Sequence, residues 1–329
     1  MSREEFLPSE EAVAAIRADL AAYETHRLAA LRNRRVLTPL SLVPAAFAAV
    51  AGFFLLVGND KPPLADDRME FAFWVFLAVV MLAGGGLWLA HRPSAMLQQS
   101  LRDRLLPSLF GFVGEVEYSH ATKPFTVDYL PPAALPGYAR IEYGDVVRGR
   151  HKWMRFELFE LHLRDAGKGG GNTVFDGVVV SFEIPTEFNG LMMATPRMGA
   201  FSTFFRDLFH GKLTELTSGN ELLDAGYEFR SDNPAAAKPL IEGPVGTVLA
   251  GLGRDWREPP RLALSNKIGF LLLPTSKDFF ELPGVETPAS YEGHIEPMIA
   301  ELSRLLDAAL LVRRAMAGKE GREEEGLLG

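Results

Sequence analysis

Two long runs without a charged side chain dominate the hydrophobic pattern of this chain. Residues 36–58 and 71–90 contain no Asp, Glu, Lys, Arg or His. A helix rises ~1.5 Å per residue, so about 20 residues cross the ~30 Å hydrocarbon core of a bilayer. The alternative, a buried hairpin of core helices, is less favoured because soluble helices of this length normally carry a polar stripe. The pattern predicts a transmembrane hairpin over 36–90, with spans 36–58 and 71–90.

The flanking cations predict an orientation for this hairpin. Cations are dense before the first run and after the second, whereas the connecting stretch 58–70 carries Lys61 and Arg68 among more acidic residues. Cytoplasmic flanks are enriched in Lys and Arg, so both termini are expected in the cytoplasm. The spans hold no ionisable group, which favours an anchor over a pump or transporter. The flanking cations are Arg27, Arg32, Arg34, Arg35, Arg92, Arg102 and Arg104.

Small residues punctuate both apolar runs. Ala48 and Gly52 form a small-xxx-small pair, and Gly84, Gly85 and Gly86 follow one another in the second run. Small residues let helix backbones approach closely. They indicate a dimer or hairpin interface, or simply the ordinary composition of a membrane helix.

The segment 1–35 is expected to be an N-terminal cytosolic amphipathic helix. Apolar residues recur at helical spacing from Val13 to Tyr23, after a start signal of Pro8, Ser9 and two glutamates. Its apolar stripe would pack on the protein's own domain, on a second copy, or on lipid headgroups.

Residues 91–318 are expected to form a cytosolic α+β domain with a mainly antiparallel sheet packed with helices. Short links separate runs of strand character. In 153–164 the alternation slips, which calls for a β-bulge near Leu158 or for a strand covered on both faces. The expected strands are Val113–Ser119, Phe125–Tyr129, Tyr138–Val147, Trp153–Arg164, Thr173–Ile184 and Asn189–Thr195.

Helical patterns frame this sheet and follow it. We expect a helix over 234–252 interrupted at Gly243-Pro244, then a hairpin of 262–265 and 268–274 with its turn at Asn266-Lys267. The long final helix runs from about Ser290 to Ala317, and 319–329 is a flexible tail. Shorter helices are expected over Met96–Phe112 and Phe201–Phe209.

Composition narrows the possible chemistry. The 329 residues include 34 Lys+Arg, 42 Asp+Glu and no Cys, for a net charge of −8. An acidic chain is a poor general nucleic-acid binder, and without Cys there are no disulfides, thiolate metal sites or Cys nucleophiles. Phosphate-loop, zinc-protease and nucleophile-elbow motifs are absent, as is a dinucleotide fingerprint. We expect no cofactor and no metal.

Four residues are weak candidates for a functional or structural site. Asp145 and Asp176 are placed to act as general acids or bases, although both stand beside glycines as turn carboxylates do. Gly177 and Gly190 end two F-x-G units, 175–177 and 188–190, in which a buried aromatic precedes a backbone bend or close approach. The F-x-G pattern is architectural and carries no catalysis by itself.

The chain resembles a bacterial two-span membrane family known as domain of unknown function 3137. The residues that carry the resemblance are the paired apolar runs, the 144–149 segment Gly-Asp-Val-Val-Arg-Gly, the two F-x-G units, 225–233, and 262–274 leading to Phe279-Phe280-Glu281. The resemblance implies a multi-pass protein of the bacterial inner membrane. It transfers no catalytic residue, and it implies a membrane-protein partner of the LemA type.

Three functions follow from these observations. The favoured one is a membrane-anchored cytosolic interaction or scaffold domain that binds a protein partner or self-associates, with no catalytic constellation. The alternatives are a membrane-tethered enzyme that uses carboxylates such as Asp145 and Asp176 on a lipid or nucleotide, and a sensor of lipid headgroups. The enzyme requires those carboxylates to converge in one pocket.

Overall fold

A computed structural model describes residues 10–57, 73–74, 76–81, 83–89, 92, 113–167, 171–197, 213–256, 258–275 and 283–317. The chain divides into two compact units. Unit 1 comprises Met1–Pro8, Leu109–Glu281 and Pro297–Gly329, and unit 2 comprises Ser9–Ser108 and Leu282–Glu296.

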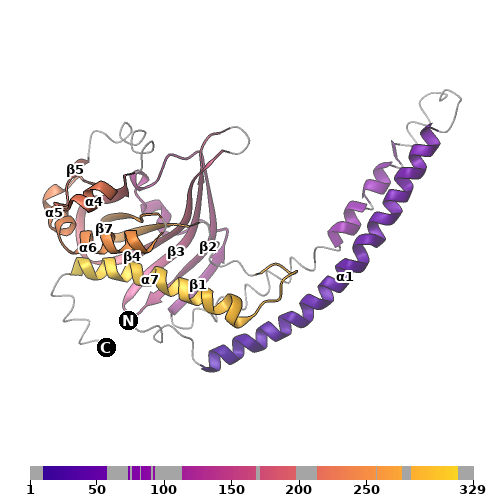
Figure 1. Ribbon diagram of the computed structural model, residues 1–329, viewed down its shortest axis with the longest axis horizontal. Coiled ribbons are helices and arrows are strands. Elements are labelled where there is room, and N and C mark those ends of the chain that lie inside the picture. The colour runs from indigo at the N-terminus through magenta and orange to yellow at the C-terminus, as the bar shows by residue number, and fades with distance from the viewer. Residues whose placement is uncertain are drawn as a thin grey trace. The chain divides into compact units, whose positions relative to one another are not determined.

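Unit 1 is built on an antiparallel sheet, which confirms the predicted sheet (Figure 1). The strands follow the order β1-β2-β3-β4-β6-β5, and β7 pairs with β4. Their bounds are β1 Gly114–His120, β2 Arg140–His151, β3 Met154–Arg164, β4 Thr173–Pro196, β5 Thr214–Leu216, β6 Tyr227–Ser231 and β7 Arg261–Pro274.

Strand β4 organises the sheet because three strands pair with it. Its first half pairs with β3, its last residues pair with β6, and its other edge pairs with β7 along most of its length. The two expected strands 173–184 and 189–195 are therefore one strand. Register shifts interrupt the β4–β7 ladder between Glu183 and Phe188 and again before Leu191.

The predicted hairpin at Asn266-Lys267 is wrong, since β7 runs continuously through both residues. Asn266 does adopt a positive φ of 53°, a conformation that Asn tolerates better than most residues. It lies opposite Phe188, where β4 is also irregular. The turn signal in the sequence thus marks a bend that two paired strands share, and the chain does not reverse there.

Strand β3 is covered on both faces. This is one of the two explanations for the shift in its alternation of apolar and polar residues, the other being a β-bulge near Leu158. Leu158, Phe159 and Leu161 are all fully buried although they point to opposite sides. The irregularity lies on the neighbouring strand, between Tyr143 and Val146 of β2, where two residues oppose Glu160. No bulge is needed at Leu158 because both faces have covering layers.

Two short 3-10 helices cover one face of the sheet, η2 Thr126–Tyr129 and η3 Pro132–Ala134. The strand predicted over Phe125–Tyr129 is wrong, because Thr126–Tyr129 forms η2 and Phe125, its N-cap, has helical backbone angles. Leu130, Ala134 and Leu135 pack in one apolar cluster with side chains of the sheet. The members from the strands are Val146, Phe159, Leu161, Leu163, Phe175, Val179, Met193, Ala263, Phe270 and Leu272.

The helix α7, Glu296–Ala317, runs along the sheet in Figure 1. The guanidinium of Arg313 donates to the carbonyl oxygen of Glu183 at 3.0 Å and lies over the Trp153 ring at 4.1 Å. The helical pattern predicted from Ser290 is confirmed, with a refinement. Ser290 caps a single π-turn, η4 Tyr291–Ile295, from which α7 continues.

The predicted helix over 234–252 forms as two helices, α5 Pro234–Glu242 and α6 Pro244–Asp255. The break falls at Gly243, as expected. Proline has no N–H to donate and is tolerated in the first turn of a helix, so Pro244 starts a helix better than it continues one. A further short helix, α4 Glu221–Gly226, precedes β6 and is capped by the Asn220 side chain.

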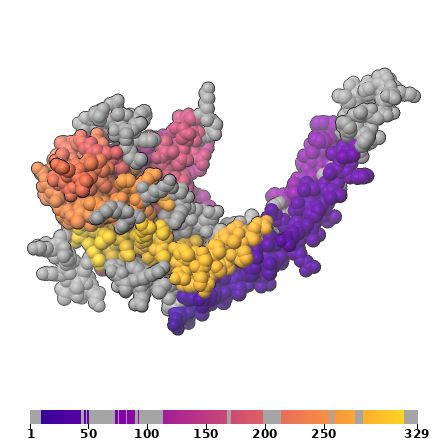
Figure 2. Space-filling model, viewed as in Figure 1, coloured from indigo at the N-terminus to yellow at the C-terminus, as the bar shows by residue number. Residues whose placement is uncertain are grey.

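Unit 2 contains the long helix α1, Glu10–Val57. The described residues between 73 and 89 are helical and lie directly against α1 in Figure 2. A Cβ atom added to Gly86 would collide with the Ser41 side chain. Gly86 is therefore the small residue that lets the two helical segments meet.

The predicted transmembrane hairpin is contradicted. Within the part of the chain that the structure describes, no helix combines the length and apolar character needed to cross a membrane. The described part of the uncharged run, 36–57, forms no helix of its own, but continues a helix whose first half is charged. The run 71–90 is described only as short helical pieces. This finding contradicts the predicted fold class with two membrane spans. It also contradicts the predicted localisation as a multi-pass protein of the bacterial inner membrane with both termini cytoplasmic.

Three sequence predictions fall outside the described residues. They are the helix over Met96–Phe112, the helix over Phe201–Phe209 and the tail 319–329.

The buried phenol of Tyr227 in β6 gives a stability prediction. Its side chain is 4% exposed and its hydroxyl has no hydrogen-bond partner within the described structure. A buried hydroxyl without a partner costs about 1–3 kcal/mol. We expect Tyr227→Phe to raise the free energy of unfolding by about 1 kcal/mol at pH 8, as measured by urea denaturation.

The same variant should change the alkaline limb of the stability curve. Burial raises the pKa of Tyr227 above its ordinary value of 10.0. A group whose pKa is raised on folding stabilises the protein below its unfolded pKa, and this contribution declines as pH rises above that value. The advantage of Tyr227→Phe should therefore widen between pH 8 and pH 11. A variant less stable than the parent at pH 8 would contradict the assignment.

Candidate functional site

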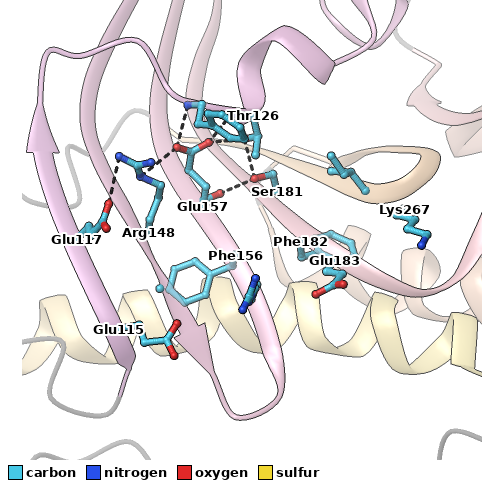
Figure 3. Close-up of a pocket in the computed structure, with 14 residues that line it drawn as sticks. Glu115, Glu117, Thr126, Arg148, Phe156, Glu157, Ser181, Phe182, Glu183 and Lys267 are labelled. Carbon is cyan, nitrogen blue, oxygen red and sulfur yellow. Dashed lines mark hydrogen bonds and ion pairs between the residues drawn. The ribbon is translucent and has the colours of Figure 1, made fainter.

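A cleft of about 600 Å³ opens on unit 1 beside η2 (Figure 3). It lies next to η2, and side chains from the neighbouring strands line it. Charged residues make up much of its lining. The lining residues are Glu115, Glu117, Phe125, Thr126, Arg148, Gly149, Arg155, Phe156, Glu157, Ser181, Phe182, Glu183, Lys267 and Ile268.

Glu157 is the buried carboxylate of the cleft, with a side chain only 3% exposed. Its oxygens accept hydrogen bonds from the backbone N–H groups of Phe125 and Thr126 at 2.9 and 2.6 Å, and from the Thr126 hydroxyl at 2.5 Å. Three donors satisfy a carboxylate that would otherwise be costly to bury. Glu157 therefore fixes the start of η2, and with it one wall of the cleft.

Ser181 extends this network on the next strand. Its hydroxyl donates to the Glu157 carbonyl oxygen at 3.1 Å and lies 2.8 Å from the Thr126 hydroxyl. The side chains of Glu157 and Ser181 come from neighbouring positions of β3 and β4 that pair directly. The wall formed by η2 is thus held in place by two paired strands.

Arg148 projects into the cleft between two carboxylates (Figure 3). Its Nη2 lies 3.3 Å from Glu117 and its Nε lies 3.6 Å from Glu157, while its side chain stays 46% exposed. Both distances exceed the about 2.7–2.9 Å of a charge-assisted hydrogen bond. The Arg148 side chain makes no hydrogen bond within the described part of the chain, so its N–H donors remain available.

The predicted site residue Asp145 lies outside this cleft, in a separate cluster with a tyrosine and a histidine. Its carboxylate is 1% exposed and accepts from the Tyr118 hydroxyl at 2.7 Å, with His120 Nδ1 at 2.5 Å. The backbone N–H of Asp145 donates to the carboxylate of Glu160 at 3.2 Å. The β2 bulge turns Asp145 toward these partners.

The predicted residue Asp176 pairs with a different histidine. Its carboxylate lies 2.7 Å from His162 Nδ1, across the β3–β4 ladder, and both side chains are well exposed. Neither Asp145 nor Asp176 lines the cleft. The shared carboxylate pocket that an enzyme would require is therefore not formed by these two residues.

Gly177 and Gly190 hold architectural positions. A Cβ atom on Gly177 would collide with the carbonyl oxygen of Leu273 on β7. Gly190 has a φ of +119° and faces the Asp232 carboxylate, which accepts from the N–H of Leu191. Both F-x-G units thus place a buried phenylalanine near a constrained glycine, at a close backbone approach for Gly177 and at a positive φ for Gly190.

Sequence reasoning missed the residues that build the cleft and the Asp145 cluster. Glu157 and Glu160 interrupt the apolar run 154–163, and in a strand covered on both faces a polar residue needs a partner. These two glutamates are therefore a signal in the sequence for buried polar contacts. Tyr118, His120 and Arg148 carry no comparable signal, because only the β1–β2–β3 pairing brings them to these positions.

Within the described residues, no group of three or more His, Asp or Glu side chains could hold a metal ion.

Comparisons with known proteins give little additional information. No family model matches the chain, and no curated protein matches it significantly. Among solved structures, the chain is similar to the mycobacterial trehalose monomycolate transport factor A, with 10% identity and a TM-score of 0.32. The match covers 59% of this chain and 88% of that one.

Proposed function

We propose that this protein is a non-enzymatic interaction scaffold that self-associates through the apolar surface of unit 2. The observation that carries the proposal is the exposure of large apolar side chains along α1 and along 73–89. The exposed residues of this apolar surface are Val36, Leu37, Leu40, Leu42, Val43, Phe47, Val50, Phe73, Trp74, Phe76, Leu77, Val80, Met81, Trp88 and Leu89.

The extent of the apolar surface calls for a partner. Its five aromatic side chains are 57–77% exposed, and together they present on the order of 500 Å². The largest apolar patch of a typical monomer is about 300–600 Å² in total. The aliphatic members add further area, so unit 2 exceeds what isolated chains normally leave in water.

A second copy of the chain suits this surface better than a charged partner. The uncharged runs bring no ionised group to the contact, so two identical surfaces can meet without placing like charges together. Gly84 and Gly85 have nothing within 4 Å of an added Cβ, which leaves room for another helix to approach closely. Gly86 already serves the contact with α1.

The oligomeric state of the full chain in aqueous buffer tests the proposal. Sedimentation velocity should show a dimer or a larger assembly. The double variant Leu40→Glu with Phe47→Glu should be monomeric at the same concentration, since each glutamate would have to be buried in the contact. Leu222→Glu is the matched control, because Leu222 is an isolated leucine that is 87% exposed in unit 1, and it should leave the assembly unchanged.

Two results would overturn the proposal. One is a parent chain that is monomeric at micromolar concentration. The other is a double variant that assembles as the parent does. A monomeric parent that co-sediments with phosphatidylcholine vesicles would give the apolar surface a lipid partner in place of a second copy.

A further inference from the structure

Ion pairs hold the guanidinium of Arg148 in place, but its N–H groups make no hydrogen bond to the described residues. Two carboxylates flank it at 3.3 and 3.6 Å, which fixes its position by charge. Its five N–H donors form a planar fork that matches a carboxylate in bidentate fashion. Because the side chain is 46% exposed, water or a ligand can take these donors.

An apolar contact stands beside this fork. Phe125 lines the cleft with a side chain that is 67% exposed, although its backbone N–H is fixed by Glu157. An exposed aromatic ring on a fixed backbone offers contact area at low entropic cost. Ile268 of β7 adds an aliphatic lining residue.

The charges of the cleft restrict the ligand. Arg155 and Lys267 line it and have no ion-pair partner among the described residues, whereas Glu115 pairs with Arg150 at 3.8 Å. Glu117 and Glu157 remain close to Arg148, and Glu183 also lines the cleft. A phosphate, with a charge near −1.5 to −2, would be repelled by all three glutamates. A single carboxylate meets about half of that repulsion and keeps the bidentate geometry.

We propose that this cleft binds an extended peptide segment of a partner protein, with one carboxylate on the Arg148 guanidinium and an apolar side chain against Phe125. This site lies wholly within unit 1 and is independent of the apolar surface of unit 2. The protein would then assemble through one unit and recognise a client through the other.

Isothermal titration calorimetry with the full chain tests the site. The probe is the peptide acetyl-Ala-Phe-Glu-Phe-Ala-amide, with a Gln analogue that lacks the carboxylate. We expect saturable binding of the Glu peptide and an affinity about tenfold lower for the Gln analogue, the effect of losing a charge-assisted hydrogen bond. Inorganic phosphate should bind more weakly than the Glu peptide.

Variants of the cleft should separate the two contacts. Arg148→Gln should weaken the Glu peptide about tenfold and remove the preference over the Gln analogue. Glu157 keeps its three donors in this variant, so η2 should stay folded. Phe125→Ala should weaken both peptides alike. The control is Arg140→Gln, because Arg140 is an exposed arginine of the same strand, 3.9 Å from Glu142, and it should change neither affinity.

Three results with the peptides would overturn the proposal. These are the absence of saturable binding at millimolar peptide, equal affinity for the Glu and Gln peptides, and an unchanged affinity in Arg148→Gln. Tighter binding of phosphate than of the Glu peptide also overturns it, in favour of a phosphate ligand. Because the measurement does not depend on the oligomeric state, it can be repeated on the monomeric unit 2 variant.

Discussion

Replacing Gly177 by alanine is expected to lower the free energy of unfolding by about 3 kcal/mol. Gly177 pairs with Pro274 in the β4–β7 ladder, and an added Cβ would meet the Leu273 carbonyl and lie 3.0 Å from the Pro274 Cα. The colliding atoms belong to a backbone, so no side chain can rotate away. The two longest strands of the sheet would have to separate locally.

Urea denaturation followed by tryptophan fluorescence measures this effect. Gly251→Ala is the matched control, since Gly251 lies in α6 with nothing within 4 Å of an added Cβ. In a helix this change should be neutral or stabilising by up to about 1 kcal/mol. A Gly177→Ala protein as stable as the parent would show that the strands tolerate a wider spacing at this point.

Replacing Arg27 by methionine is expected to release the segment 283–296 from α1. The Arg27 side chain is 5% exposed, bonds both oxygens of Glu24 at 2.6 Å, and donates to the Val285 carbonyl at 2.8 Å. These contacts lie within unit 2. Loss of a buried charged group and its hydrogen bonds lowers local stability by about 3 kcal/mol. Hydrogen exchange of the amides near Val285 should therefore accelerate about 100-fold.

A matched variant and the pH dependence sharpen this test. Arg34→Met removes an exposed pair with Glu286, and such a pair contributes only about 0–1 kcal/mol.

The hydrogen bond from Arg27 lowers the pKa of Glu24 below its ordinary 4.5. A lowered pKa stabilises above the unfolded value, and this contribution is lost as pH falls through the folded pKa. Protection near Val285 should therefore decline below pH 4.5 in the parent but not in Arg27→Met. Equal hydrogen exchange near Val285 in Arg27→Met and Arg34→Met would contradict the proposed role of Arg27.

The fold was predictable where one element carries its own signal. Proline and glycine mark the break between α5 and α6, and a continuous apolar stripe marks α7, because both signals act within a few residues. The failures at Phe125–Tyr129 and Asn266-Lys267 have a different origin. Glu157 binds two amides of the first segment from 31 and 32 residues away, and β4 keeps Asn266 within a strand.

The candidate site shows the same division. The sequence indicates Asp145 as a possible reactive carboxylate, but its partners Tyr118 and His120 come from a neighbouring strand. Nothing in the sequence distinguishes Arg148, since a single arginine in a strand resembles any solvated one. Its place between Glu117 and Glu157 exists only once β1, β2 and β3 have paired.

The sequence by itself determined the two uncharged runs, the periodicity of the long helices, the antiparallel character of the sheet and the absence of cysteine chemistry. Each is a property of neighbouring residues or of composition. The tertiary structure decided the setting of the uncharged runs, the bend shared by β4 and β7, and the grouping of polar side chains around Arg148 and around Asp145. Burial and hydrogen-bond partners are set by residues distant in the chain, and no local pattern records them.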